Sequence, residues 1–388
     1  MAKLITITEA PDSSIVFANN PIVFKATTYY SLGEGESFLR IVCRATFELE
    51  GVPSFYKGNT KFKIELSQPV ENLGTATFNL SDAAQTIIRS VHSQIDMKGG
   101  DALYPYAVIA EVNFEDVWIK DNQQISGVLE NLRPKASFRV VPGGMTDYEL
   151  YVYGSRNLAL FTSEGKKMTR KPDGGIVYAG EMMIVPVLRG GNNNSVAATG
   201  KLLVGDTEIY RGSDIIEGLK LDYHTASPEN KVTEGEFVFN SSLIGSITGY
   251  YRTNTKDVHF LRFINGFGAV ENISVRSKDK LSYEVSGETH SLVQEASVLP
   301  SDRRYATKSQ PVGVYELSSG YVPQRWAEWY VQELLTSPRV WIQLGGKWIP
   351  ALIEAEDDCV IYDRAKPEMP HVDFTLRLAI DGVTGVTW

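Results

Sequence analysis

The sequence predicts a mainly β protein of two or three antiparallel β-sandwich-like modules with two accessory helices. Three observations support this prediction. Apolar and polar residues alternate along several segments, as in half-buried strands. Glycine-rich turn sequences separate these segments. The length of 388 residues exceeds a single core of ordinary size, because domains commonly hold about 100–200 residues.

The clearest predicted strand starts at Leu39 and alternates for about a dozen residues, which puts Cys43 on its core face. Shorter segments with the same period follow at residues 61–67 and 75–80, and another lies near the end at residues 372–380. In each of them the apolar side chains occupy every second position. These segments are therefore expected to be strands with one face in a core.

Two segments have a helical period instead. The first runs over residues 83–95, and Asp82 and Gln85 precede it with the spacing of a capping box. The second runs over residues 324–335 and ends before Pro338. Its apolar stripe is aromatic, and that of the first helix is aliphatic. The two stripes are Ala84, Ile87, Ile88, Val91 and Ile95, and Trp326, Trp329, Tyr330 and Leu334.

Turn sequences predict hairpins and module boundaries. Gly205-Asp206 joins two short strands, and Asn265-Gly266 after residues 261–264 is a favoured sequence for a type I′ turn. Pro142-Gly143-Gly144 ends a block of strands, and a polar stretch begins at Ser227. We therefore expect modules at residues 1–143, 144–232 and 233–388, with the aromatic helix in the last.

Composition limits the function classes. The charges sum to −9, which argues against a nucleic-acid coat, because phosphate neutralisation needs a basic surplus. The apolar run at residues 182–188 is far shorter than the roughly 20 residues that span a bilayer. No leader-like stretch follows Met1, so synthesis in the cytoplasm without membrane insertion is expected. Cys43 and Cys359 are interpreted as buried thiols.

No recognised catalytic, nucleotide-binding or metal-binding motif occurs, so we expect no enzyme activity, no cofactor and no metal. Two charged runs leave alternatives open. The acids from Glu354 to Asp358 could bind a hard cation such as calcium, or form a solvated turn. The basic run at residues 166–171 could be a solvated loop, or contact an acidic patch on a neighbouring copy.

Paired aromatic residues provide the candidate contact sites. The chain holds 19 tyrosines, and tyrosines at strand edges serve protein interfaces and sugar stacking alike, although most belong to ordinary sheets. The residues singled out as candidate ligand or partner contacts are Tyr29, Tyr30, Tyr250, Tyr251 and Arg252.

The order of several short segments resembles tail-tip or baseplate-type virion structural proteins of tailed phages and prophages of Bacteroidota. In the first half of the chain, the segments are residues 10–12, residues 15–24 and the strand at 74–81, which leads into a helix. Residues 160–162, 171–172 and 261–268 follow. The last segment is the stretch 303–379, in which Ser319-Gly320 precedes the tryptophan-rich helix and residues 335–341 follow it. None of them is a catalytic signature.

The resemblance implies a non-enzymatic subunit of the virion tail. It would assemble into a ring or hub with copies of itself and other tail proteins, with a host surface glycan or receptor as a further expected partner. Sheet edges that neighbouring copies complete would suit such assembly. Two alternatives remain open from the residues: a glycan- or receptor-binding module, and a polysaccharide hydrolase with two facing carboxylates.

Overall fold

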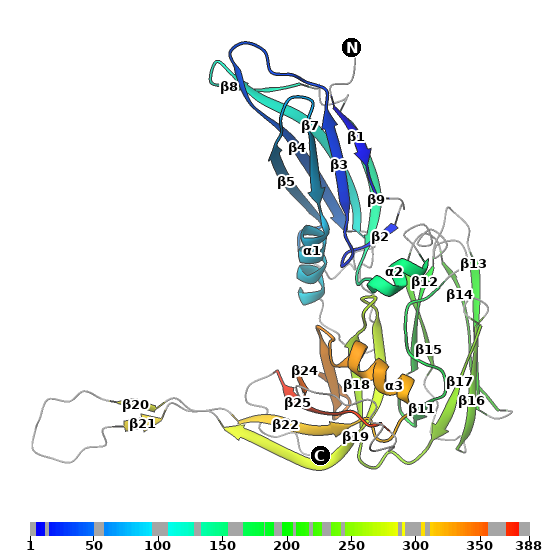
Figure 1. The fold of residues 1–388 in the computed structure, drawn as a ribbon. Helices are drawn as coiled ribbons and strands as arrows, with labels where there is room; N and C mark the ends of the chain where they lie inside the picture. The colour runs from blue at the N-terminus through cyan, green and yellow to red at the C-terminus, as the bar shows by residue number, and fades with distance from the viewer. Residues whose placement is uncertain are drawn as a thin grey trace, which may run out of the picture.

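The computed structural model describes residues 5–11, 15–49, 58–94, 108–127, 133–153, 166–181, 183–189, 196–204, 207–216, 220–226, 234–241, 245–285, 289–291, 304–306, 311–355 and 370–379. The predicted mainly β fold is confirmed. Three β modules and a projecting two-stranded arm make up the molecule (Figure 1).

The N-terminal module is a sandwich of two sheets. One sheet has the order β1-β3-β6 and the other the order β2-β9-β7-β4-β5, with β8 paired to β7. The rings of Phe24 and Phe114 pack across the sandwich with centroids 5.8 Å apart, and Cys43 is buried beside them, as predicted. The strands are β1 (Ile5–Glu9), β2 (Ile15–Phe17), β3 (Val23–Thr28), β4 (Glu36–Leu49), β5 (Lys61–Pro69), β6 (Thr75–Asn79), β7 (Val108–Lys120), β8 (Gln123–Ser126) and β9 (Lys135–Val141).

Helix α1 (Ser81–Gln94) closes one end of this sandwich, where Ala84, Ile87 and Ile88 join the core. The predicted aliphatic stripe is thus confirmed for these three residues. A short helix that the periodicity did not predict, α2 (Asp147–Tyr153), follows the sandwich. In Figure 1 it lies between the N-terminal sandwich and the middle module.

The middle module contains two sheets, with the orders β10-β12-β15 and β11-β17-β16-β13-β14. Most pairs are antiparallel, but β11 runs parallel to β17. β16 and β17 belong to the same sheet as β13 and β14, so this sheet continues past the expected boundary at residue 232. The strands are β10 (Lys166–Lys167), β11 (Gly175–Tyr178), β12 (Met183–Arg189), β13 (Val196–Val204), β14 (Thr207–Ile216), β15 (Lys220–Ala226), β16 (Gly235–Ser241) and β17 (Gly245–Arg252).

The C-terminal module is a closed six-stranded barrel rather than an open sandwich, with the order β18-β19-β22-β25-β24-β23. Closure depends on the pairing of β18 with β23, in which Arg262 lies opposite Trp341. The strands are β18 (Val258–Ile264), β19 (Val270–Val285), β22 (Pro311–Ser318), β23 (Val340–Leu344), β24 (Lys347–Ala355) and β25 (Asp373–Leu378).

The predicted aromatic helix connects β22 to β23. It begins as α3 (Gln324–Trp329) and continues as a π-helical turn (Tyr330–Leu334), in which the N–H of Leu335 bonds to the carbonyl of Tyr330. The predicted face, which includes Trp326 and Trp329, packs on the barrel core, and this prediction is confirmed. The π-helical turn also buries Glu333, which the helical period did not predict.

A two-stranded arm extends from the barrel. The far part of β19 pairs with β22 from Leu281 to Val285, and beyond it β20 (Thr289–Ser291) pairs with β21 (Arg304–Ala306). Figure 1 shows β20 and β21 far from the body of the molecule. The arm leaves the barrel on the side opposite the middle module.

Candidate functional site

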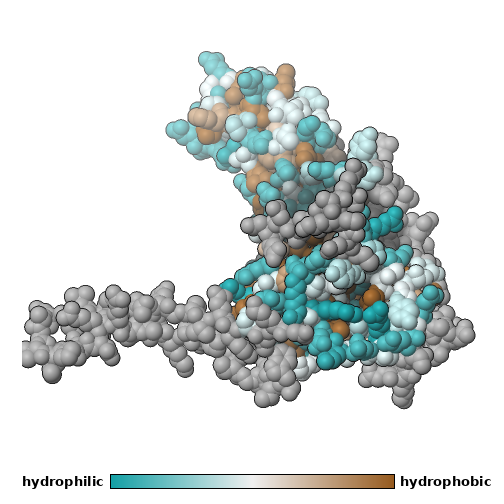
Figure 2. Space-filling view, turned by 60° about the horizontal axis from the view of Figure 1, so that its bottom comes forward, coloured by the Kyte–Doolittle hydropathy of each residue, from teal (hydrophilic) through white to brown (hydrophobic). Residues whose placement is uncertain are grey.

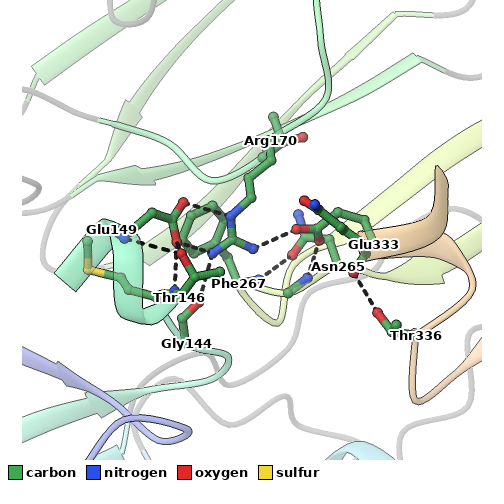
Figure 3. A network of polar contacts seen from close by, with 12 residues as sticks. Gly144, Thr146, Glu149, Arg170, Asn265, Phe267, Glu333 and Thr336 are labelled. Carbon is green, nitrogen blue, oxygen red and sulfur yellow. Dashed lines mark hydrogen bonds and ion pairs between the residues drawn. The ribbon is translucent and has the colours of Figure 1, made fainter. Parts of the chain in front are cut away.

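Arg170 joins the three modules through a single guanidinium group (Figure 3). Its Nε and Nη2 donate to the two carboxylate oxygens of Glu149 at 2.7 and 2.6 Å. Its Nη1 donates to Oε1 of Glu333 at 2.6 Å, and Nη2 also donates to the carbonyl of Gly144 at 3.0 Å. The guanidinium carbon lies 4.0 Å from the ring centroid of Phe267. These partners belong to α2, the π-helical turn, the end of the sandwich and a barrel loop.

Local structure fixes each partner of Arg170. Thr146 and Glu149 form a reciprocal capping box at the start of α2, with the Glu149 N–H on Oγ1 of Thr146 and the Thr146 N–H on Glu149. Glu333 also accepts the N–H of Gly266 at 2.5 Å. The pKa of Glu149 is lowered, because its bonds to Arg170 outweigh the opposing effect of burial.

The loop between β18 and β19 is organised by Asn265. The predicted two-residue turn at Asn265-Gly266 is wrong: the ladder ends at Ile264 and Val270, so five residues form the loop. The side-chain oxygen of buried Asn265 accepts the N–H groups of Phe267 and Ala269. Its amide nitrogen donates to the carbonyl of Met168 at 2.8 Å. The buried side chain of Asn265 therefore holds a five-residue loop together, where the sequence predicted an exposed two-residue turn.

The sandwich contacts the barrel loop closely at Gly143 and Gly144. The N–H of Gly144 donates to the carbonyl of Gly266 at 2.9 Å. Gly143 has a φ of +77°, and a Cβ on it would lie 2.2 Å from the carbonyl carbon of Phe267. Only glycine allows both the left-handed backbone and this approach. The ring of Phe17 lies 5.8 Å from that of Phe267.

The interpretation of the basic run as a solvated loop is wrong for Arg170 and Lys171, which are both half-buried. Lys171 donates from Nζ to the carbonyl of Asn272 at 3.0 Å and lies 5.9 Å from the Trp326 ring. The sequence could not show that buried acids surround these cations. The side chains of the two preceding lysines lie outside the described part of the molecule.

Two buried carboxylates near Lys171 lie between the middle module and the barrel. Glu181 accepts bonds from the N–H of Tyr178 and the hydroxyl of Ser274, and Glu271 accepts one from Asn265. Burial raises the pKa of both carboxyl groups, and the charge of Lys171 opposes this shift. Burial thus disfavours the ionised form of both acids, and Lys171 supplies the positive charge that opposes this effect.

A pocket of about 650 Å³ opens where β17 of the middle module meets β18 and β19 of the barrel. Tyr250 and Arg252 line it, so two of the candidate contact residues lie in the same cavity. Lys256 and Arg276 add two further cations. Tyr250 is 41% exposed, and the Arg252 guanidinium lies 6.0 Å from its ring centroid.

The structure separates the other candidate contact residues. Tyr29 is exposed on the sandwich, whereas Tyr30 stacks on Trp118 at 3.9 Å and donates its hydroxyl to Glu36 at 2.5 Å. Burial and this carboxylate raise the pKa of Tyr30 to about 12. Tyr251 is 1% exposed, so it offers no surface to a ligand in this structure. Exposure along a strand alternates, which separates Tyr251 from its neighbour Tyr250.

The acidic run at the end of β24 is only partly described. Glu354 pairs with Nε of Arg377 at 3.1 Å, and residues 356–358 lie outside the described part of the chain. Among the described residues no group of three or more histidine, cysteine or acidic side chains could hold a metal ion. In that same part of the chain, no helix combines the length and the apolar character needed to cross a membrane.

Comparisons with known proteins give no family. No family model and no curated protein matches the sequence. Among solved structures, a trypsin-activated alpha-2-macroglobulin from Escherichia coli matches over 97% of this chain and 22% of its own, with 10% identity and a TM-score of 0.23. A Salmonella alpha-2-macroglobulin reacted with methylamine matches over 97% and 23%, with 7% identity and a TM-score of 0.23. This chain thus spans about a fifth of their length, and similarity at this level supports no functional conclusion.

Proposed function

We propose that this protein is a non-enzymatic structural subunit of a phage virion, placed at the tail tip or baseplate and assembling with copies of itself and other tail proteins. The particle is suggested by the resemblance of the sequence segments. The projecting arm is the observation that carries the assembly role, because it exposes pairing groups far from the body of the molecule.

The arm is a two-stranded ribbon in the part of the chain that the structure describes. In the described part of the chain, β20 and β21 pair only with each other. An isolated two-stranded hairpin is at best marginally stable in water, and its open edges can pair with another chain. A neighbouring subunit that covers the ribbon would supply the missing contacts. The same contact repeated around an axis closes a ring.

The Arg170 junction supports this role, because it holds the sandwich, the middle module and the barrel in a fixed relation. Glu333 is 2% exposed in its side chain, and Arg170 and Glu149 are each 20% exposed. Removal of one member would leave a buried charge without its partner. A subunit that presents an arm on one side and a sandwich on another needs such a rigid junction to repeat the same geometry in every copy.

The far end of the sandwich offers a second contact surface. Tyr29, Phe38 and Leu73 are 55%, 76% and 60% exposed, and Figure 2 shows apolar residues among polar ones on this module. Phe38 lies at a bulge in β4 with a φ of 55°. An exposed aromatic side chain on a strained backbone adds no stability to the isolated chain. Bulges also commonly mark functional positions.

The pocket does not favour the hydrolase alternative. A general acid for glycoside hydrolysis needs a raised pKa. Glu234 lines the pocket, but its pKa is lowered, chiefly by the N–H of Thr253. This carboxylate is therefore suited to carrying a fixed negative charge and not to donating a proton.

Deletion of the arm tests the assembly role. Glu284 and Val312 lie opposite each other in the ladder, so replacing residues 285–311 by Asn-Gly closes β19 and β22 with a two-residue hairpin. We expect the variant to keep the melting temperature of the full chain and to be monomeric in light scattering. We also expect it to be absent from purified particles. Equal incorporation of both forms into particles would contradict the proposal.

A further inference from the structure

We propose that the pocket between β17 and β19 binds a carboxylate-bearing sugar of an acidic polysaccharide. This inference goes beyond the assembly role and does not rest on it. The pocket is formed by two modules, because Arg252 comes from β17 of the middle module and Arg276 from β19 of the barrel. A ligand in it would therefore touch both modules at once.

The cations of the pocket lie outside close ion pairs with the residues that the structure describes, although the charge of Arg252 helps to lower the pKa of Glu234. Arg252, Lys256 and Arg276 line it, and among the described residues none of them forms an ion pair with a carboxylate. Two acids, Glu234 and Asp257, share the lining. Oε1 of Glu234 already accepts two bonds from Thr253, at 3.0 and 3.1 Å. Three cations against these two acids leave the lining with a net charge of +1 (3 − 2), opposite in sign to the −9 of the whole chain.

The aromatic residues point to a sugar rather than to a small inorganic anion. Tyr250 lines the pocket and is 41% exposed, and a phenol ring offers an apolar face and a polar hydroxyl to a sugar ring. The hydroxyl of Tyr178 accepts a bond from Nη2 of Arg276 at 3.3 Å, which orients that guanidinium. A guanidinium fork matches a carboxylate in two parallel hydrogen bonds.

The size and polarity of the pocket agree with this ligand. Its volume of about 650 Å³ lies within the usual range of small-molecule sites, roughly 300–1,000 Å³. Its lining is dominated by charged and hydroxyl-bearing side chains, whereas lipid or drug-like sites are mostly apolar. An oligosaccharide of two or three units presents the matching pattern of hydroxyls and carboxylates.

Calorimetry on the full chain tests the inference. The probes are trigalacturonate, a hyaluronan tetrasaccharide and sialyllactose as acidic sugars, maltotriose as a neutral sugar, and hexaglutamate as an acidic peptide. We expect at least one acidic sugar to bind, maltotriose to bind at least tenfold more weakly, and affinity to fall as salt rises, because the contacts are partly ionic. Tighter binding of hexaglutamate would assign the pocket to an acidic protein segment and overturn the inference.

Substitutions locate the binding. Arg252→Gln with Lys256→Gln should weaken the acidic sugar at least tenfold, and Tyr250→Leu should weaken it without changing the salt dependence. Arg325→Gln is the matched control, since Arg325 is exposed on α3 and does not line the pocket. Melting temperatures confirm that each variant is folded. The inference is overturned if none of the three acidic sugars binds at millimolar concentration, or if the control weakens binding as much as the double variant.

Discussion

Replacement of Arg170 by methionine tests the junction most sharply. Methionine keeps much of the aliphatic volume but removes four hydrogen bonds and the contact with Phe267. Among the described residues, it leaves the carboxylate of Glu333, which is 2% exposed, with one hydrogen bond, from the N–H of Gly266. Breaking a buried pair from one side costs about 3–5 kcal/mol. We expect about 3 kcal/mol, since water reaches the partly exposed Glu149.

A second substitution separates the loss of the pair from the loss of packing. Glu333→Gln on the Arg170→Met background removes the buried charge and keeps an oxygen for the Gly266 N–H. The double variant should therefore regain about 1 kcal/mol or more over Arg170→Met alone. Urea unfolding followed by tryptophan fluorescence measures the free energy of unfolding of the single and the double variant. A loss below about 1 kcal/mol for Arg170→Met, or additive losses in the double variant, would refute the reasoning.

Three further predictions concern stability and assembly. Gly143→Ala should lower the melting temperature more than Gly174→Ala, since both positions have positive φ but only the former would press a Cβ against the Phe267 backbone; equal shifts would contradict this. Burial raises the pKa of Glu181 in the folded chain. The stability that the protonated side chain contributes is therefore fully present below the ordinary carboxyl range and is lost as the pH rises. The melting temperature of Glu181→Gln should therefore rise relative to that of the native chain as the pH is raised from the ordinary carboxyl range upward, and a difference that stays constant with pH would argue against this. Phe38→Asn should keep or raise the melting temperature, because asparagine tolerates the left-handed backbone, while incorporation into particles falls; unchanged incorporation would remove this surface from the assembly role.

Local periodicity predicted the elements that have one buried face. The alternation from Leu39 onward predicted β4, and the aliphatic stripe from Ala84 to Ile95 predicted α1. The aromatic stripe at Trp326 correctly gave the helix on the barrel. Such patterns are local, because a side chain's direction follows from its position in a strand or helix. Sequence reasoning could also have found α2, since Thr146 and Glu149 have the spacing of a capping box.

The junction and the barrel depend on distant contacts that no local pattern contains. Closure of the barrel pairs residues about 80 positions apart, as between Arg262 and Trp341. Arg170 stood out only as part of a basic run, and its partner Glu333 follows in sequence by 163 positions. Asn265 looked like a turn residue, but burial of its side chain made it the centre of a longer loop. Tertiary burial thus overrode each local preference.

Immunogold electron microscopy of the phage particles to which we propose that this chain belongs tests the proposed function most directly. An antibody against the chain should label the distal end of the tail, and virions lacking the chain should show no label. Gold on the host envelope alone, or particles that contain no trace of this polypeptide, would contradict a role in the virion.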